Sequence, residues 1–346
     1  MQAPARFGDY LDDFRSTNQI IRQQNSIKFR VQCEKESSEL LSDPRQQLLN
    51  DVEMFIRYLA AQQMEQLQQS AILIIQQFIV SKNKLISMQV LEEQLLLLCA
   101  DKKRSISSFA AQSIQFFQPE KNYELFWQRA FEWSKNSQMR FNAVSCINYL
   151  LQKDQNAGQK IQANPSFVND LWSFISETKE VSPLGIECFV QILSQKQTSH
   201  VFSVILQNLS QSPQNALCSL CIMHQLFDQN LVENRQLANI LNDNYQSLLG
   251  QLLGKQYKDQ QIQKEIGLLL PYFAKFKPLT FAETYMRQAF DYLFDKYEKL
   301  SLLVTLGKMI EVLGAPSYSF FSQVIICILQ SIEPKKKQMD FSNDAP

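Results

Sequence analysis

Hydrophobic positions recur at steps of three and four residues along almost the whole chain. The clearest stretch, residues 122–152, holds two such patterns on either side of a short polar break at 134–138. The positions that share this spacing are Leu125, Phe126, Arg129, Ala130 and Trp133 before the break, and Phe141, Val144, Ile147, Asn148 or Tyr149, Leu150 and Leu151 after it. The spacing predicts two amphipathic helices that form a hairpin with one buried seam.

The same plan repeats along the sequence. The second helix of each pair is predicted to begin near residues 18, 65, 103, 138, 182, 213, 259 and 297. This spacing centres on about 40 residues, which is typical of HEAT-like helical repeats. Pro183 and Pro213 fit the first turn of such helices. A backbone N–H in that turn has no acceptor within the helix, so the lack of an N–H in proline breaks no hydrogen bond. We also expect a loop at 154–165 and one uninterrupted helix at 281–297.

Small residues recur early in these second helices. They are Ala71, Ala110, Ala111, Ala143, Gly185, Ala216 and Gly267. Because a small side chain lets two helices approach closely, we expect these positions to lie where neighbouring helices pack.

Strand signals are nearly absent, since the sequence has no Asn-Gly or Asp-Gly turn and no sustained two-residue alternation. One hairpin of about 35 residues buries too little apolar surface to offset the entropy lost on ordering it, so hairpins must stack. The predicted fold is therefore all-α, an α-solenoid of about eight HEAT-like hairpins with an ARM-type fold. We expect a single solenoid over residues 1–333 and a disordered polar tail at 334–346.

Charge and hydropathy narrow the classes of function. The chain has 346 residues, and 34 Lys and Arg balance 34 Asp and Glu. Nucleic-acid binding depends largely on an excess of cationic side chains, so this balance predicts no nucleic-acid partner. The longest apolar runs are too short for a membrane span, and the N-terminus lacks the apolar segment of a secretory signal. A cytoplasmic location is expected.

The sequence positions of the cysteines and of His224 indicate packing roles and disfavour catalytic or metal-binding roles. Most of the seven cysteines lie in apolar helical patterns, which predicts reduced, buried thiols in a cytosolic or nuclear protein. Cys218 and Cys221 form one CxxC, but His224, on the same helix, is the only further candidate ligand, which disfavours zinc or redox chemistry. His224 lies within an apolar helix face and is expected to be a hydrogen-bonded packing residue. We predict no metal and no cofactor.

The sequence lacks the common catalytic motifs. Phosphoryl transfer needs a phosphate-binding loop, a base and magnesium ligands, and the sequence has no GxGxxG, GxxxxGK, HRD-like or DFG-like pattern. No GxSxG surrounds a serine nucleophile. We therefore predict no catalytic residue and expect this chain not to be an enzyme.

Two segments resemble the N-terminal HEAT region of the target-of-rapamycin (TOR) Ser/Thr kinases. One comprises residues 129–133 and 139–144, which read RAFEW and MRFNAV. The other, residues 268–281, reads LLLPYFAKFKPLTF and is similar to the family's leucine-leucine-proline helix end and phenylalanine-basic-proline turn. The likeness is clearest over about residues 121–151 and 245–332. The connection at 227–245 is shorter than in the family, and the sequence stops soon after Pro334, where a TOR kinase continues through many more repeats.

The resemblance implies a non-catalytic protein-protein interaction scaffold of TOR signalling. In TOR kinases the corresponding region docks a Raptor-type adaptor and receives a Rheb-type small GTPase, so similar partners are expected here. Two alternatives stay open. In the first, the chain is the N-terminal fragment of a TOR-type Ser/Thr protein kinase whose catalytic domain is absent here. In the second, it is a generic HEAT adaptor that serves either transport or a phosphatase.

Three residues are candidates for protein binding. Arg140 and Asn142 are polar residues expected on the exposed face of a second helix. Arg104 belongs to the basic cluster 102–104, for which a solubilising role is favoured over a binding role. The apolar run at 324–329 in the last helix predicts self-association or a neighbour at the C-terminal end.

Overall fold

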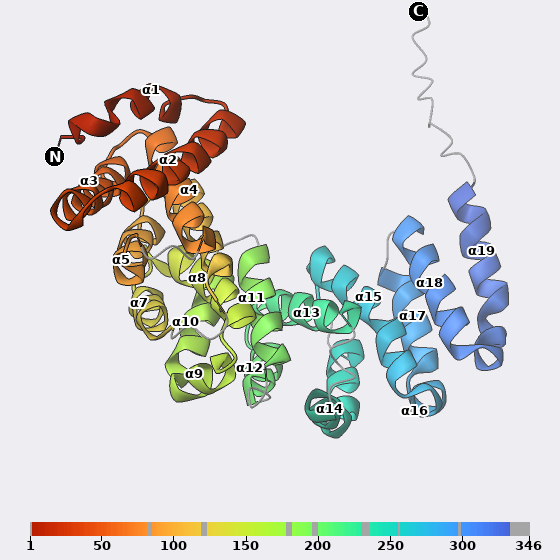
Figure 1. The fold of residues 1–346 in the computed structure, drawn as a ribbon. Coiled ribbons are helices and arrows are strands. Elements are labelled where there is room, and N and C mark those ends of the chain that lie inside the picture. The colour runs from red at the N-terminus through yellow and green to blue at the C-terminus, as the bar shows by residue number, and fades with distance from the viewer. Residues whose placement is uncertain are drawn as a thin grey trace, which may run out of the picture. The chain divides into compact units, whose positions relative to one another are not determined.

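The computed structural model describes residues 2–81, 85–118, 123–177, 182–195, 200–229, 235–254, 257–296 and 299–332 (Figure 1). Within these ranges every regular element is a helix and no strand occurs, which confirms the all-α prediction. The tail predicted at 334–346 lies outside the described residues. The chain divides into two compact units, Met1–Val201 and Phe202–Pro346.

Unit 1 holds most of the helices. They are η1 Ala5–Tyr10, α1 Leu11–Phe14, α2 Gln19–Glu39, α3 Ser42–Ala60, α4 Glu65–Ser81, α5 Met88–Cys99, α6 Arg104–Gln112, η2 Ser113–Phe116, α7 Glu124–Ser134, α8 Arg140–Lys153, α9 Ala157–Ala163, α10 Pro165–Ser176 and α11 Pro183–Ser194.

Unit 2 follows with α12 at its boundary. Its helices are α12 His200–Asn208, α13 Pro213–Asp228, α14 Arg235–Gly254, α15 Gln260–Phe276, α16 Pro278–Thr284, α17 Met286–Lys296, α18 Lys299–Leu313, η4 Ala315–Phe320 and α19 Phe321–Ile332.

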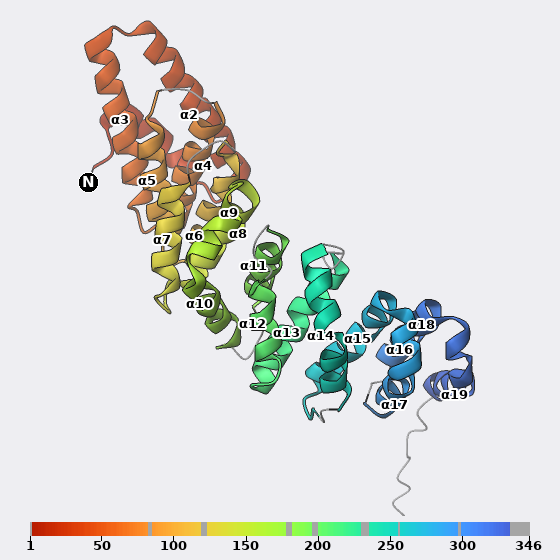
Figure 2. The ribbon, with the colours of Figure 1, turned by 90° about the horizontal axis from the view of Figure 1, so that it is seen from below.

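The helices of unit 1 form two layers. Figure 2 shows α3, α5 and α7 following one another along one side and α2, α4, α6 and α8 along the other. In the second layer α4 packs against α2 and α6, and α8 packs against α6 and α11, while α3 contacts α4 and α5, and α7 contacts α8. The first helices α3, α5 and α7 therefore form one layer, which we call the outer layer, and the second helices α2, α4, α6 and α8 form the other.

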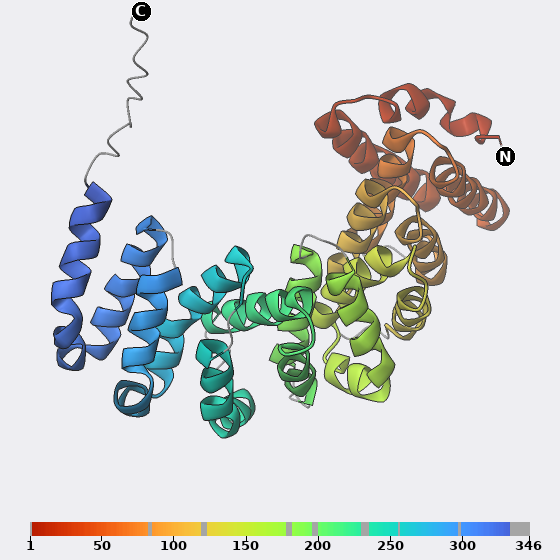
Figure 3. The ribbon, with the colours of Figure 1, turned by 180° about the vertical axis from the view of Figure 1, so that it is seen from behind.

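Unit 2 has a related arrangement of its own. Helix α15 packs against α13 and α18, and α18 packs against α19. Figure 3 shows α19, in dark blue, at the end of this series.

Helices begin at or just after all the positions predicted for second helices, as α2, α4, α6, α8, α11, α13, α15 and α18. Pro183 and Pro213 occupy the first turns of α11 and α13, and the side chains of Ser182 and Ser212 cap those helices. A continuous solenoid of about eight hairpins over 1–333 stays a prediction.

The small residues lie where second helices meet their neighbours, as predicted. All the alanines of that set are fully buried, and Gly267 is buried in α15. At Gly185 of α11, an added Cβ would lie 2.1 Å from Ile175 Cγ2 on α10. Only glycine therefore permits this approach of α11 to α10.

Two predictions about helix boundaries are wrong. The expected loop at 154–165 contains α9, which buries Ala157 and Ile161 completely and begins where the N–H of Ala157 donates to the carbonyl of Asp154. The expected single helix at 281–297 is divided at Tyr285, between α16 and α17. Tyr285 is buried, and its hydroxyl donates to the carbonyl of Gln246 on α14, a contact that the periodicity of the sequence does not show.

The seam predicted in α7 also needs correction. Phe126 and Ala130 are buried as expected, and so is Trp127, whose Nε1 donates to Asp154 Oδ2 at 2.7 Å. Arg129, in contrast, has a side chain that is 53% exposed. Leu125 and Trp133 are partly exposed. These three residues therefore form a separate stripe beside the buried one.

Candidate functional site

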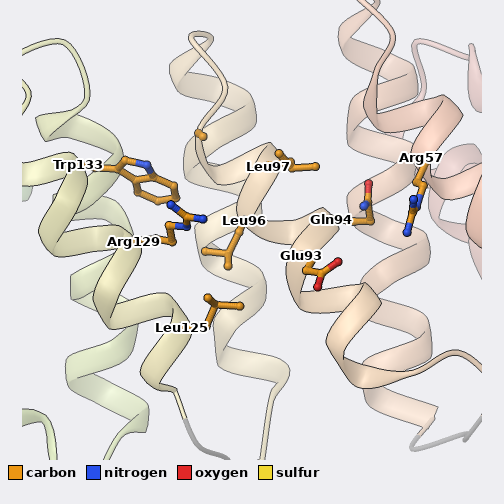
Figure 4. Close-up of a pocket in the computed structure, with 9 residues that line it drawn as sticks. Arg57, Glu93, Gln94, Leu96, Leu97, Leu125, Arg129 and Trp133 are labelled. Atoms are coloured by element: carbon orange, nitrogen blue, oxygen red, sulfur yellow. The ribbon is translucent and has the colours of Figure 1, made fainter.

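A groove of about 620 Å³ opens on the outer helix layer of unit 1 (Figure 4). Three helices supply its lining. The residues are Arg57 from α3, Glu93, Gln94, Leu96, Leu97 and Ala100 from α5 and its C-cap, and Leu125, Arg129 and Trp133 from α7. We call this hollow the α5–α7 groove.

Helical spacing explains how these side chains converge. Leu125, Arg129 and Trp133 follow one another at four-residue steps, so they share one face of α7, and Figure 4 shows them side by side facing Leu96. Glu93, Leu96, Leu97 and Ala100 form the matching stripe on α5. That helix is fixed at its start by Ser87, whose side chain accepts a hydrogen bond from the N–H of Val90 at 3.3 Å.

The groove presents apolar surface to solvent. Leu97 is 65% exposed, which is high for a leucine beside buried neighbours such as Leu96. Leu125 and Trp133 are partly exposed across the groove. Single exposed apolar residues are ordinary, but a concave set drawn from several helices is typical of an interaction site.

Two guanidinium groups flank this apolar surface. Arg57 lies in the last turn of α3 and is exposed, and no hydrogen bond or ion pair engages its side chain within the part of the chain that the structure describes. Arg129 Nη1 lies 2.8 Å from Glu132 Oε2, and both side chains of this ion pair are exposed. Glu93 accepts a hydrogen bond from Gln89 Nε2 at 3.0 Å. The lining thus carries two cations and one carboxylate.

The three residues predicted to bind protein lie together, but outside this groove. Arg104 is the exposed first residue of α6, with Cζ 4.9 Å from the centroid of the Phe141 ring. Arg140, at the start of α8, pairs with Glu177 (Nη1 to Oε1, 2.5 Å), and its side chain is only 16% exposed. The candidates thus lie where the starts of α6 and α8 come close to each other.

Asn142 is not exposed, and that expectation is wrong. Asn142 is 5% exposed, and its Nδ2 donates to the carbonyls of Cys99 at 2.7 Å and Asp101 at 2.9 Å. The last carbonyls of a helix have no partner within the helix, and Asn142 supplies one at the end of α5. Asn142 therefore has a structural role, which is to link the start of α8 to the end of α5 by hydrogen bonds.

The groove residues were missed from the sequence, although one signal pointed to them. Arg129 falls at a position that periodicity assigns to the buried seam of α7. A long cationic side chain is rarely buried without a partner. An arginine at such a position indicates that its stripe, with Leu125 and Trp133, faces solvent.

In unit 2, His224 lies in a cluster of polar groups between α13 and α15. Its Nδ1 is 3.0 Å from Glu265 Oε2, and its Nε2 is 3.6 Å from Asp228 Oδ2. Tyr272 donates its hydroxyl to Asp228. The hydrogen bond with Glu265 raises the pKa of His224, aided by the charges of Glu265 and Asp228 and opposed by burial and by Lys308. His224 is thus hydrogen-bonded, as predicted, and joins the two helices.

Burial favours the protonated form of three thiols, those of Cys33, Cys218 and Cys221. Burial raises the pKa of Cys33 to about 12, that of Cys218 to about 11 and that of Cys221 to about 12. Over the described residues, no group of three or more His, Cys, Asp or Glu side chains could hold a metal ion.

Unit 2 also has a second groove, of about 450 Å³. It lies between α15, α16 and α18 and is lined by Pro271, Tyr272, Lys275, Pro278, Lys308, Glu311 and Val312. Four of these residues, Pro271, Tyr272, Lys275 and Pro278, belong to the segment 268–281.

Comparisons with known proteins assign no family. No protein-family model matches the chain, and no curated protein matches it. A crystal structure described as an engineered protein is similar over 94% of this chain and 84% of its own, with 11% identity and a TM-score of 0.39, which is too low to carry an argument. Among the described helices, none is long and apolar enough to cross a membrane.

Proposed function

We propose that this chain is a non-catalytic, helical-repeat scaffold that binds proteins through the α5–α7 groove. The observation that carries the proposal is the convergence of Trp133, Arg57 and Arg129 in one hollow with an exposed leucine, Leu97, and a partly exposed one, Leu125. Tryptophan and arginine are enriched among the residues that dominate protein-protein binding energy, whereas lysine is depleted at interfaces. The lining contains no lysine.

The partners are proposed from the sequence resemblance. Helix α7 carries both the groove stripe and the residues 129–133 that resemble TOR kinases. We propose a Raptor-like adaptor or a small GTPase of TOR signalling as the bound protein, at a cytoplasmic location. The same resemblance supports a second candidate, in which the chain is the N-terminal part of a TOR-type Ser/Thr kinase. The third candidate is a generic HEAT adaptor that serves either transport or a phosphatase.

Affinity purification of the endogenously tagged chain, read by mass spectrometry and by its apparent mass on a gel, tests these candidates. The wild type is compared with the groove variant Arg57→Glu/Arg129→Glu and with the control Arg15→Glu/Arg45→Glu. The control changes the charge equally at exposed arginines that do not line the groove.

We expect a band near the chain mass of 40.2 kDa and a Raptor-like adaptor that is recovered with the wild type and the control but not with the groove variant. A far larger band supports the kinase candidate. Partners that include no TOR-complex component contradict the TOR assignment. Partners recovered equally with the groove variant contradict docking in the α5–α7 groove.

A further inference from the structure

We propose that the α5–α7 groove receives an acidic amphipathic helix of a partner protein, with leucine-type side chains on one face and carboxylates on both flanks. The proposal rests on the proposed function and names the chemistry of the partner segment.

The length of the groove fits two turns of helix. From Leu125 to Trp133 the stripe on α7 spans eight residues, which is about 12 Å at 1.5 Å per residue. The apolar side chains at positions i, i+3, i+4 and i+7 of a partner helix extend over about 10.5 Å. One such stripe therefore matches the stripes on α5 and α7, in the manner of a helix laid in a groove.

The chemistry of the lining favours a helix over an extended segment. A buried peptide must pair its backbone N–H and C=O groups, and a helix does so internally. An extended segment needs an edge strand or convergent amides, but α5 and α7 are helices whose own backbone groups are paired along their length. Gln94 is the one side-chain amide of the lining, and it is 6% exposed.

The apolar contacts come from both walls. Leu97 is 65% exposed on α5, and Trp133 is partly exposed on α7. No hydrogen bond engages the indole N–H of Trp133 in the portion that the structure describes, so it is available to a partner. A leucine-type side chain set against Leu97 and Trp133 removes apolar surface of both walls from water.

The two arginines of the lining determine where the partner helix carries its carboxylates. Arg57 stands on the α3 side and Arg129 on the α7 side, as Figure 4 shows. The guanidinium of Arg57 is unengaged in the described part of the chain, and the exposed pair of Arg129 with Glu132 contributes little, so a partner carboxylate can replace Glu132. Figure 4 shows Glu93 between the two arginines, where its charge disfavours a third carboxylate of the partner.

A binding assay with defined peptides tests the proposal on the full chain. The probe is a fluorescent, terminally blocked peptide of about 18 residues, with leucines at i, i+3, i+4 and i+7 and glutamates on both flanks of that stripe. Two further peptides carry lysine in place of every glutamate, or the same residues in scrambled order. Fluorescence anisotropy measures the affinity of each peptide.

We expect the glutamate peptide to bind the wild type and the Arg15→Glu/Arg45→Glu control equally. Arg57→Glu/Arg129→Glu should weaken its binding by about tenfold or more, because charge pairs across an interface become repulsive. The lysine peptide should bind the groove variant better than the wild type. Leu97→Asp, at an exposed position that does not support the core, should also weaken binding, and circular dichroism confirms the fold of each variant.

Equal binding of the glutamate and lysine peptides to the wild type, or of the ordered and scrambled peptides, overturns the proposal. So does unchanged binding to Leu97→Asp. If the glutamate peptide fails to bind while the adaptor is still recovered in a groove-dependent way, the helix occupant is wrong and the scaffold function stands. If both fail, the scaffold function fails as well.

Discussion

The side-chain amide of Asn142 donates a hydrogen bond to the carbonyl of Cys99 over 2.7 Å, and so joins the start of α8 to the end of α5. A second bond from the same nitrogen reaches the carbonyl of Asp101. Asn142→Ala leaves both carbonyls without this donor. We expect the free energy of unfolding to fall by about 1–3 kcal/mol, measured by urea denaturation.

Gln128→Ala is the control for Asn142, because Gln128 is exposed on α7 and its loss should change stability by no more than about 0.5 kcal/mol. An Asn142→Ala protein as stable as this control would show that the two bonds contribute nothing net.

Alanine substitutions at Gly185 and, as the control, at Gly250 test the close packing of α11 on α10. Gly185→Ala forces a methyl group to within 2.1 Å of Ile175 Cγ2, and such overpacking destabilises by about 1–3 kcal/mol. Nothing lies within 4 Å of an added Cβ at Gly250 in α14, so Gly250→Ala should stabilise by up to about 1 kcal/mol. Thermal unfolding of the two variants should therefore shift in opposite directions, and a shift of both in the same direction contradicts the packing described.

The cluster around His224 makes stability depend on pH. The folded-state pKa of His224 is raised above its ordinary value of 6.5, chiefly by the hydrogen bond with Glu265. The protonated form is therefore held more tightly in the folded protein, so its contribution is fully present below pH 6.5 and is lost as the pH rises through the raised pKa. The groups that face His224 are Glu265, Asp228, Tyr272 and Lys308.

His224→Gln should remove this dependence. We expect the drop in unfolding free energy between about pH 6 and pH 9 to be smaller in His224→Gln than in the wild type. Urea titrations at both pH values measure it. An identical drop in the two proteins would mean that His224 gains no proton affinity on folding.

The last helix exposes an apolar face, as the run at 324–329 predicted. The residues concerned are Ile325, Ile326, Ile328 and Leu329, between 38% and 58% exposed. Helix α19 carries no Lys, Arg, Asp or Glu, so two copies can meet on this face without like charges. The predicted self-association should appear as a mass that rises with concentration in light scattering.

Ile325→Glu/Leu329→Glu should abolish that rise, because each copy then places carboxylates in the contact. Val304→Glu, at a 60% exposed position on α18, is the control and should leave the rise intact. A wild type whose mass is constant with concentration contradicts self-association.

Much of the helical framework was predictable, because periodicity, N-cap serines and prolines act locally. Pro183 and Pro213 mark the starts of α11 and α13, and the buried alanines mark where helices meet. Which polar residue of a helix is buried was not predictable. Asn142 is buried because the end of α5 lies over it, a contact between segments far apart in the sequence.

The groove was hidden for the same reason. Leu125, Arg129 and Trp133 keep core-like spacing. Helix α7 packs on α8 and buries Phe126 and Ala130, however, and it leaves that stripe open. Spacing shows that a stripe exists, whereas only the neighbouring helices determine whether it is covered.

Site-specific photo-crosslinking in cells tests the account most directly. A photoreactive phenylalanine derivative replaces Leu97 in the α5–α7 groove or, as the control, Val80, which is 55% exposed on α4 outside the groove. We predict that Leu97 yields a crosslink to an acidic, leucine-containing helical segment of one partner protein and that Val80 does not. Crosslinks to the same partner from both positions, or none from Leu97 while that partner still co-purifies, would contradict docking in the groove.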